Sequence, residues 1–310
     1  MKIRRRHIPI FLSVTNESLP YLTVTLESIC EHTANECTVD ARILCCDLAS
    51  YNRRKLRHMK FENIDITIVD VDSRVEDYRA DFEERLGCFY GEEVFYLFFI
   101  ADMYPRLAKA MYVSCGTIFR DDVEKLYHVD LGDDLIGGIV KQDKFSDRLR
   151  AYRERWVGVN PDEYVDCSAI LINLSLFRKY RISGRFARLL MGYNFDTVSA
   201  ASDYMNFLCR GRVRVLNSEW KIDDDSAAGI AVFSPYQLPW HYVNMPYADE
   251  FWDVARKTPL YEDVRDAYIC FDEAARVKEI KNVNDVLSHA SELEGSRGGF
   301  YDILGDDYLI

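Results

Sequence analysis

The sequence predicts an α/β protein in which a mainly parallel sheet is covered by helices on both faces. Its first two-thirds alternates apolar segments of strand length with segments of helical periodicity. The strand-like segments are almost entirely apolar, as expected where both faces of a sheet are buried. The chain has 310 residues and is 48% hydrophobic, so it can fill one large core or two small ones.

The predicted strands are short apolar runs, and they cover residues 8–14, 37–46, 64–69, 110–113, 135–140, 168–174 and 213–216. A helix is predicted after Pro20, because apolar residues recur there at helical spacing and proline suits a first helical turn. Further helices are predicted over residues 52–59 and 92–103. In this doubly wound layout, a ligand is expected outside the carboxyl ends of the strands.

The last third of the chain has a different character. After residue 210 the sequence becomes irregular and rich in aromatic residues and proline, and from 261 to 293 it is helical and charged. We therefore predict a main domain over residues 1–262 and a helical C-terminal extension over residues 263–310.

Charge and composition exclude several functions. The formal net charge is −12 and the only dense basic run is at residues 4–6, which argues against nucleic-acid binding. The basic residues 2–6 support at most a weak peripheral membrane contact. No signal peptide or membrane span is expected. The nine cysteines are scattered without zinc spacing, as is typical of free thiols in a reducing cytosol.

Several motifs occur in a characteristic order along the chain. The run DLGDDLIGG at residues 130–138 is accompanied by motifs at 19–29, 109–113, 121–127, 170–174, 203–206, 239–240 and 251–262. Residues 8–262 thereby resemble family 8 glycosyltransferases. That resemblance implies a GT-A, Rossmann-like fold with α/β/α layers, and transfer of a sugar from a nucleotide donor with retention of configuration.

The resemblance also implies a divalent-metal site, whose ligands this chain replaces. The family's Asp-x-Asp motif falls on Ser114, Cys115 and Gly116, and its metal-binding histidine falls on Val232. Its diphosphate-binding lysine falls on Leu238. We therefore expect no cofactor, with manganese or magnesium bound only if other residues have rebuilt the site.

Other positions of the implied donor pocket are also replaced. The aspartate that contacts the nucleotide base falls on Thr15, and the aromatic residue three positions later falls on Ser18. The arginine that faces the nucleotide sugar falls on Leu97. The first two positions of the family's D-Q-D segment are Ala201 and Ser202, whereas the surrounding scaffold motifs are kept.

Some residues could still carry chemistry. Asp166 and Asp203 are the best candidates for a surviving carboxylate pair, although hydrogen bonds to loop amides explain them as well. The run at residues 223–225 could hold a cation or be a solvated acidic loop. His241 could be a displaced metal ligand or a packed side chain, and Cys115 lacks a visible base that would make it a nucleophile.

Three functions remain open. The first is a non-catalytic or accessory subunit in surface glycan or glycoprotein synthesis, whose partner is an active glycosyltransferase or another protein. The second is an active retaining hexosyltransferase that uses a UDP-sugar through a non-standard or metal-independent site. The third is a carbohydrate- or protein-binding module. A glycan acceptor and a bacterial, cytoplasmic setting are expected from the resemblance.

Overall fold

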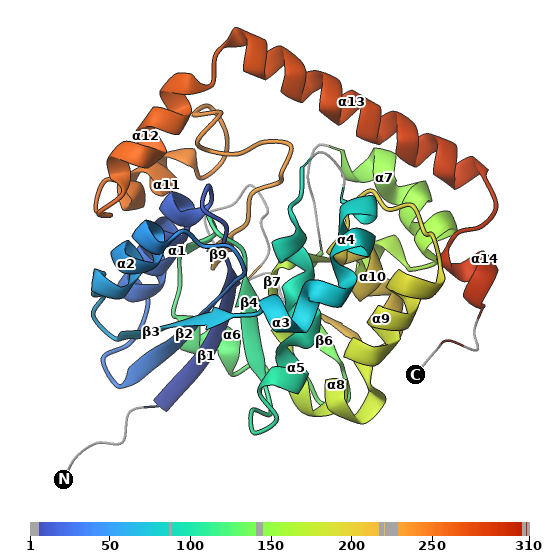
Figure 1. The fold of residues 1–310 in the computed structure, drawn as a ribbon, viewed down its shortest axis with the longest axis horizontal. Helices are drawn as coiled ribbons and strands as arrows, with labels where there is room; N and C mark the ends of the chain where they lie inside the picture. The colour runs from blue at the N-terminus through green and yellow to red at the C-terminus, as the bar shows by residue number, and fades with distance from the viewer. Residues whose placement is uncertain are drawn as a thin grey trace.

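A seven-stranded sheet forms the centre of the computed structural model, which describes residues 6–86, 89–140, 145–216, 220, 229–305 and 308 (Figure 1). The strand order is β3-β2-β1-β4-β7-β6-β8. These strands are β1 (Arg6–Ser13), β2 (Cys37–Cys45), β3 (Ile64–Asp70), β4 (Ala110–Val113), β6 (Ile136–Val140), β7 (Val165–Ile172) and β8 (Val213–Val215).

The sheet is mostly parallel, with one reversed strand. β1, β2, β3 and β4 run parallel to one another, as do β6 and β8. β7 lies antiparallel between β4 and β6, with Val113 opposite Ala169 and Ile136 opposite Ile172. A second, two-stranded sheet pairs β5 (Ile118–Phe119) with β9 (Ile230–Ala231).

The two faces of the sheet are covered by separate groups of helices. Along β1, Ile10 and Leu12 pack in one apolar cluster and Phe11 packs in the other, as the alternation of side chains in a strand requires. The first cluster contains apolar residues of α1 (Leu19–Glu31), α2 (Ser50–His58) and α6 (Val123–Tyr127).

The second cluster is larger and is covered by more elements. These are α3 (Asp72–Val75), α4 (Arg79–Arg85), the 3₁₀ helix η2 (Glu92–Phe99), α5 (Ile100–Met103), α7 (Ser146–Tyr152), η3 (Arg153–Val157), α8 (Leu174–Tyr180), α9 (Ile182–Gly192) and α10 (Ala201–Leu208). Short 3₁₀ turns at Glu76–Tyr78 (η1) and Pro161–Glu163 (η4) connect them.

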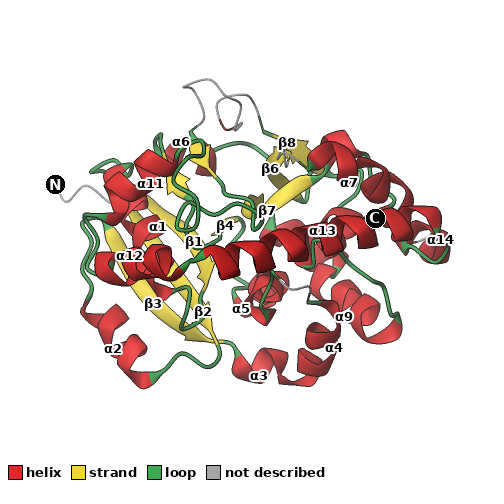
Figure 2. Ribbon diagram, turned by 90° about the horizontal axis from the view of Figure 1, so that it is seen from above, coloured by secondary structure: helices red, strands yellow, loops and turns green. Residues whose placement is uncertain are grey.

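The C-terminal helices extend across the sheet. α11 (Ala248–Ala255) and α12 (Tyr261–Cys270) lie beside α1, and α13 (Glu273–Gly295) crosses from α12 toward α7 and α14 (Phe300–Leu304) (Figures 1 and 2). The second half of α13 packs on the larger cluster through Val283, Leu287, Ala290 and Leu293. None of the described helices is long and apolar enough to cross a membrane.

The predicted layered architecture and the six longer strands are confirmed, and β8 is present as the additional strand. The predicted apolar helix over residues 92–103 is present, and its first eight residues are wound as a 3₁₀ helix. In that winding the side chains of Phe95 and Phe98 share a face, and both rings pack against Phe186. The proposed division of the chain at residue 262 stays a prediction.

Candidate functional site

A cavity of about 610 Å³ opens at the carboxyl edge of the central sheet. Ser13 ends β1, Ser114 and Cys115 follow β4, and Cys167 lies near the start of the reversed strand β7. The backbone N–H of Ser114 donates to the carbonyl of Ser168 at 2.8 Å, which joins two of these strand ends. The cavity therefore lies where a doubly wound sheet ordinarily binds its ligand.

Most of the donor-pocket positions inferred from the sequence line this one cavity. The structure brings together Thr15, Ser18, Leu97, Ser114, Cys115, Asp166, Ala201, Ser202 and Leu238. Gly116, Val232 and Asp203 are not among its lining residues. Donor binding by the lining positions and replacement of the family's residues at them stay predictions, but these positions share one location.

Gly116 is covered by the side chain of Trp240. Its φ is +91°, and a Cβ atom at this position would lie 2.6 Å from Cζ3 of the indole. Trp240 stacks on Tyr21, with ring centroids 3.8 Å apart, and the Gly116 N–H donates to Oγ1 of Thr25 at 2.9 Å. This backbone conformation and this ring together leave no room for an aspartate side chain.

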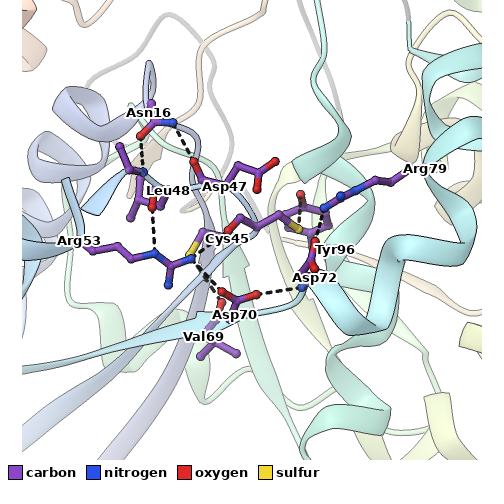
Figure 3. A network of polar contacts seen from close by, with 12 residues as sticks. Asn16, Cys45, Asp47, Leu48, Arg53, Val69, Asp70, Asp72, Arg79 and Tyr96 are labelled. Atoms are coloured by element: carbon purple, nitrogen blue, oxygen red, sulfur yellow. Dashed lines mark hydrogen bonds and ion pairs between the residues drawn. The ribbon is translucent and has the colours of Figure 1, made fainter. Parts of the chain in front are cut away.

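The loop after β1 uses its own polar groups to hold its shape. The N–H of Thr15 donates to Oγ of Ser18 at 2.9 Å, and the N–H of Ser18 donates to Oγ1 of Thr15 at 3.2 Å. Between them, Asn16 donates to the carbonyl of Asp47 and accepts from the N–H of Ala49 (Figure 3). Thr15 and Ser18 thus shape the start of α1, and both line the cavity.

The ends of β2 and β3 are fixed beside this loop. Arg53 donates to the carbonyl of Leu48 at 2.9 Å and to Oδ2 of Asp70 at 2.8 Å (Figure 3). Tyr96 of η2 donates to Sγ of Cys46 at 3.0 Å. These contacts tie the ends of β2 and β3 to each other and the end of β2 to η2, which supplies Glu93 and Leu97 to the cavity wall.

Cys115 is unsuited to act as a nucleophile. Burial raises the pKa of its thiol to about 12, and its Sγ donates to the carbonyl of Ser13 at 3.2 Å. The thiolate is the reactive form of cysteine, so this thiol is inert near neutral pH. The raised pKa agrees with the expectation from the sequence that Cys115 is not an activated nucleophile.

Alkylation rates test whether the Cys115 thiol is unreactive. Iodoacetamide at neutral pH is expected to modify the exposed Cys270 well before Cys115, because the Cys115 thiol stays protonated. Peptide mass spectrometry over a time course measures both rates. Equal rates at neutral pH would contradict this account.

The two candidate carboxylates lie in different environments. Asp166 lines the cavity, and its Oδ1 accepts from the N–H of Ser168 at 2.9 Å. Asp203 is fully buried behind the lining and accepts four hydrogen bonds, from the hydroxyls of Tyr152 and Tyr164 and from two backbone N–H groups. Burial raises the pKa of Asp203, and these hydrogen bonds oppose the rise. The pair is therefore not presented jointly to the cavity.

His241 is held by the C-terminal helix. Its ring stacks on Phe271, with centroids 4.0 Å apart and planes 1° from parallel, and its Nδ1 lies 2.8 Å from Oε2 of Glu279. These contacts favour the packed histidine over the displaced metal ligand. Val232, at the family's histidine position, packs on the apolar cluster that contains α1.

The residues present do not fit a divalent metal ion. Ser114, Gly116 and Val232 offer no carboxylate or imidazole at the implied ligand positions. In the described part of the chain, no three or more histidine, cysteine, aspartate and glutamate side chains cluster so that they could hold a metal. The acidic run at residues 223–225 lies outside the described residues.

Several lining residues were missed by the sequence analysis. Glu93 of η2 lines the cavity, and burial, followed by the charges of Glu92 and Glu17, raises its pKa. Lys278 and Glu279 of α13 also line it, together with Phe271 and Asn282. The helical periodicity after residue 261 predicted helices there, but no motif indicated that they return to the cavity.

Comparison with known proteins identifies the family. The model of the family described as Glycosyl transferase family 8 matches residues 9–223, which is more than half of the chain. The chain belongs to glycosyl transferase family 8. A protein of Haemophilus influenzae described as "Putative glycosyltransferase" is 21% identical over 115 residues, which cover 37% of this chain and 34% of that protein. The chain therefore aligns with about a third of this curated family relative's length.

Solved structures show the same fold. The bifunctional glycosyltransferase WbbM superposes with a TM-score of 0.68 at 17% identity, over 84% of this chain and 52% of WbbM. The galactosyltransferase LgtC, in complex with donor and acceptor sugar analogues, gives a TM-score of 0.66 at 18% identity, over 81% of this chain and 96% of LgtC. This chain spans about half of WbbM. At these identities the likeness establishes the predicted GT-A-like fold, and activity has to be argued from the cavity.

Proposed function

We propose that this family 8 protein has lost metal-dependent donor transfer and serves as a non-catalytic, accessory subunit in the synthesis of a surface glycan or glycoprotein. The observation that carries the proposal is the contact between Gly116 and Trp240. It removes the space for a second Asp-x-Asp carboxylate, so the implied metal site is closed by packing as well as by substitution.

The charge of the cavity supports the same conclusion. Departure of a nucleoside diphosphate requires positive charge where the phosphate oxygens develop negative charge. Among the described residues that line the cavity, Lys278 is the single lysine or arginine, against the carboxyl groups of Glu17, Glu93, Asp166 and Glu279. Leu97 and Leu238 stand where the resemblance places an arginine and a lysine. A diphosphate here would meet more negative than positive charge.

A second candidate is an active hexosyltransferase that transfers sugar from a UDP-sugar without a metal. The observation that favours this candidate concerns Lys278. Its side chain lines the cavity and has no hydrogen-bond or ion-pair partner in the described part of the chain. Its ammonium group is available to neutralise one phosphate charge. Substitution of Lys278 therefore distinguishes the active hexosyltransferase from the non-catalytic subunit.

A turnover assay tests both candidates. The proposal predicts no release of UDP from UDP-glucose or UDP-galactose, with manganese, magnesium or EDTA present. Metal-independent release that is lost in Lys278→Ala but kept in Lys281→Ala would establish the second candidate. Manganese-dependent release would overturn the proposal, because it requires a working metal site.

An accessory role also requires a partner surface. We propose that an active glycosyltransferase or another protein binds the exposed apolar side chains of α12 and α13, which are Tyr268, Ile269, Val277 and Ile280. A cytoplasmic location, with at most weak membrane contact by the basic residues 2–6, remains part of this proposal. A carbohydrate- or protein-binding module is the third candidate function, separate from the accessory role.

A further inference from the structure

The cavity is bordered by the C-terminal helices as well as by the ends of the strands. Its lining includes Phe271, which lies between α12 and α13, and Ala275, Lys278, Glu279 and Asn282 in the first half of α13. All five residues lie beyond residues 9–223, the part that matches the family model. In Figure 1, α13 runs from α12 toward α7 across the top of the central sheet. The first half of this helix therefore forms a wall of the cavity.

The segment that includes this wall holds no fully buried residue. Every residue from 265 to 282 is exposed or half-buried, whereas Val264 before it and Val283 after it are buried. Val264 packs in a small apolar cluster with residues of α11, and Val283 packs on the larger cluster of the sheet. The chain is thus anchored at two points, and the stretch between them borders the cavity.

One face of α13 changes in composition where the helix leaves the core. Ala275 and Glu279 lie in line with Val283 and Leu287, because residues four apart share a helix face. Over the core this face is apolar, as expected for a surface that stays buried. At the cavity the same face carries an alanine and a glutamate, which water can solvate. The sequence therefore suits a first half of α13 that is not permanently packed.

Two adjacent residues, His241 and Tyr242, hold this part of the chain in place. The His241 ring stacks on Phe271 with centroids 4.0 Å apart, and its Nδ1 lies 2.8 Å from Oε2 of Glu279. Tyr242 meets the ring of Phe271 edge-on at 5.5 Å. Burial, followed by its hydrogen bond to Glu279, raises the pKa of Tyr242 to about 12, so the hydroxyl donates at neutral pH. In the described part of the chain, no other ring or hydrogen-bond contact ties residues 271–282 to the protein outside α12 and α13.

We propose that residues 265–282 form a strap that opens and closes at the cavity, with His241 and Tyr242 as its latch. Segments with few buried apolar contacts open at a lower free energy than the core, and opening of the strap removes no fully buried side chain from the core. The strap opens by local unwinding of the first half of α13 between its two anchors. Release of the latch admits a ligand, and its closure encloses the ligand. The strap operates for any ligand of the cavity, so this inference does not depend on the proposed loss of donor chemistry.

Hydrogen–deuterium exchange on the full chain tests the strap. The amides of residues 277–282 and 286–291 all lie within the hydrogen-bonded body of α13, beyond its four unbonded N-terminal N–H groups. Those of residues 277–282 are expected to exchange about tenfold faster or more, because only they belong to the strap. His241→Ala and Glu279→Ala should each accelerate them about tenfold further, since each removes contacts of the latch.

Matched controls change the same residue types in the anchored half of α13. His289→Ala and Glu292→Ala remove side chains that are largely exposed, so the exchange of residues 277–282 should stay unchanged. A thiol probe then measures access to the cavity. Ser202 lines the cavity, and alkylation of a Ser202→Cys variant by iodoacetamide should be about tenfold faster when His241→Ala is added. The rate of Cys270, which is exposed, should stay the same.

The results distinguish a local strap from general loosening of the protein. Faster exchange confined to the strap in both latch variants, together with faster alkylation at position 202, would establish the strap. Equal exchange in the two halves of α13 would overturn it. Acceleration that spreads to residues 286–291 in both latch variants would also overturn it, because the latch would then support the whole helix. An unchanged alkylation rate at position 202 would show that the strap does not control access to the cavity.

Discussion

Gly116→Asp is expected to lower the free energy of unfolding by about 2–4 kcal/mol, since it adds overpacking to a strained backbone conformation. The new Cβ would lie within 2.7 Å of two carbon atoms of the Trp240 indole, at a φ of +91°. Trp240 cannot move freely, because it stacks on Tyr21 and packs near Phe251. Urea unfolding followed by circular dichroism measures the loss.

Gly132→Asp is the matched control for this substitution. Gly132 also has a positive φ, +52°, but a Cβ there would meet no atom within 4 Å. The Gly132→Asp variant should therefore lose about 1 kcal/mol of unfolding free energy, which is the cost of the backbone conformation without any overpacking. Equal losses in the two variants would show that Trp240 does not close the site. We also expect that Ser114→Asp combined with Gly116→Asp gives no sugar transfer, because Leu97, Val232 and Leu238 remain.

Asp203→Ala is expected to cost about 3–5 kcal/mol of stability, which is typical when one partner of a buried charged network is removed. The substitution leaves the hydroxyls of Tyr152 and Tyr164 and the N–H groups of Val198 and Ser199 without the acceptor that now serves them. Equilibrium unfolding in urea measures the loss.

Asp166→Ala provides the comparison. Asp166 accepts a hydrogen bond from the N–H of Ser168 and lines the cavity, so its loss should cost about 1 kcal/mol. A similar cost for both variants would contradict the structural role assigned to Asp203. If Asp203→Ala were stable but lacked ligand binding, the carboxylate would have to act at the cavity after all.

Much of the fold is predictable because burial controls the sequence pattern. The strand at residues 37–46 is apolar at most positions, with Asp40 and Arg42 as half-buried exceptions, since most of β2 is covered. The helix after Pro20 shows its buried face at helical spacing. The direction of β7 is not predictable in this way. An apolar strand has the same composition whether it runs parallel or antiparallel, and only the lengths of the connections constrain it.

The cavity is predictable only in part. Thr15, Leu97 and Ser114 could be placed together because the family resemblance fixes their positions in the fold. Glu279 and Lys278 could not, since they lie in a charged helix whose return to the sheet depends on tertiary contacts such as that of His241 with Phe271. The closure at Gly116 also required coordinates, because it depends on φ and on the ring of a distant Trp240.

Calorimetric titration of UDP-glucose and UDP-galactose, each with and without manganese, tests the central claim most directly. The proposed loss of the metal-dependent donor site predicts no manganese-enhanced binding of either nucleotide-sugar. Micromolar binding that appears only with manganese would contradict it, because such binding requires ligands that the closed site around Gly116 does not provide.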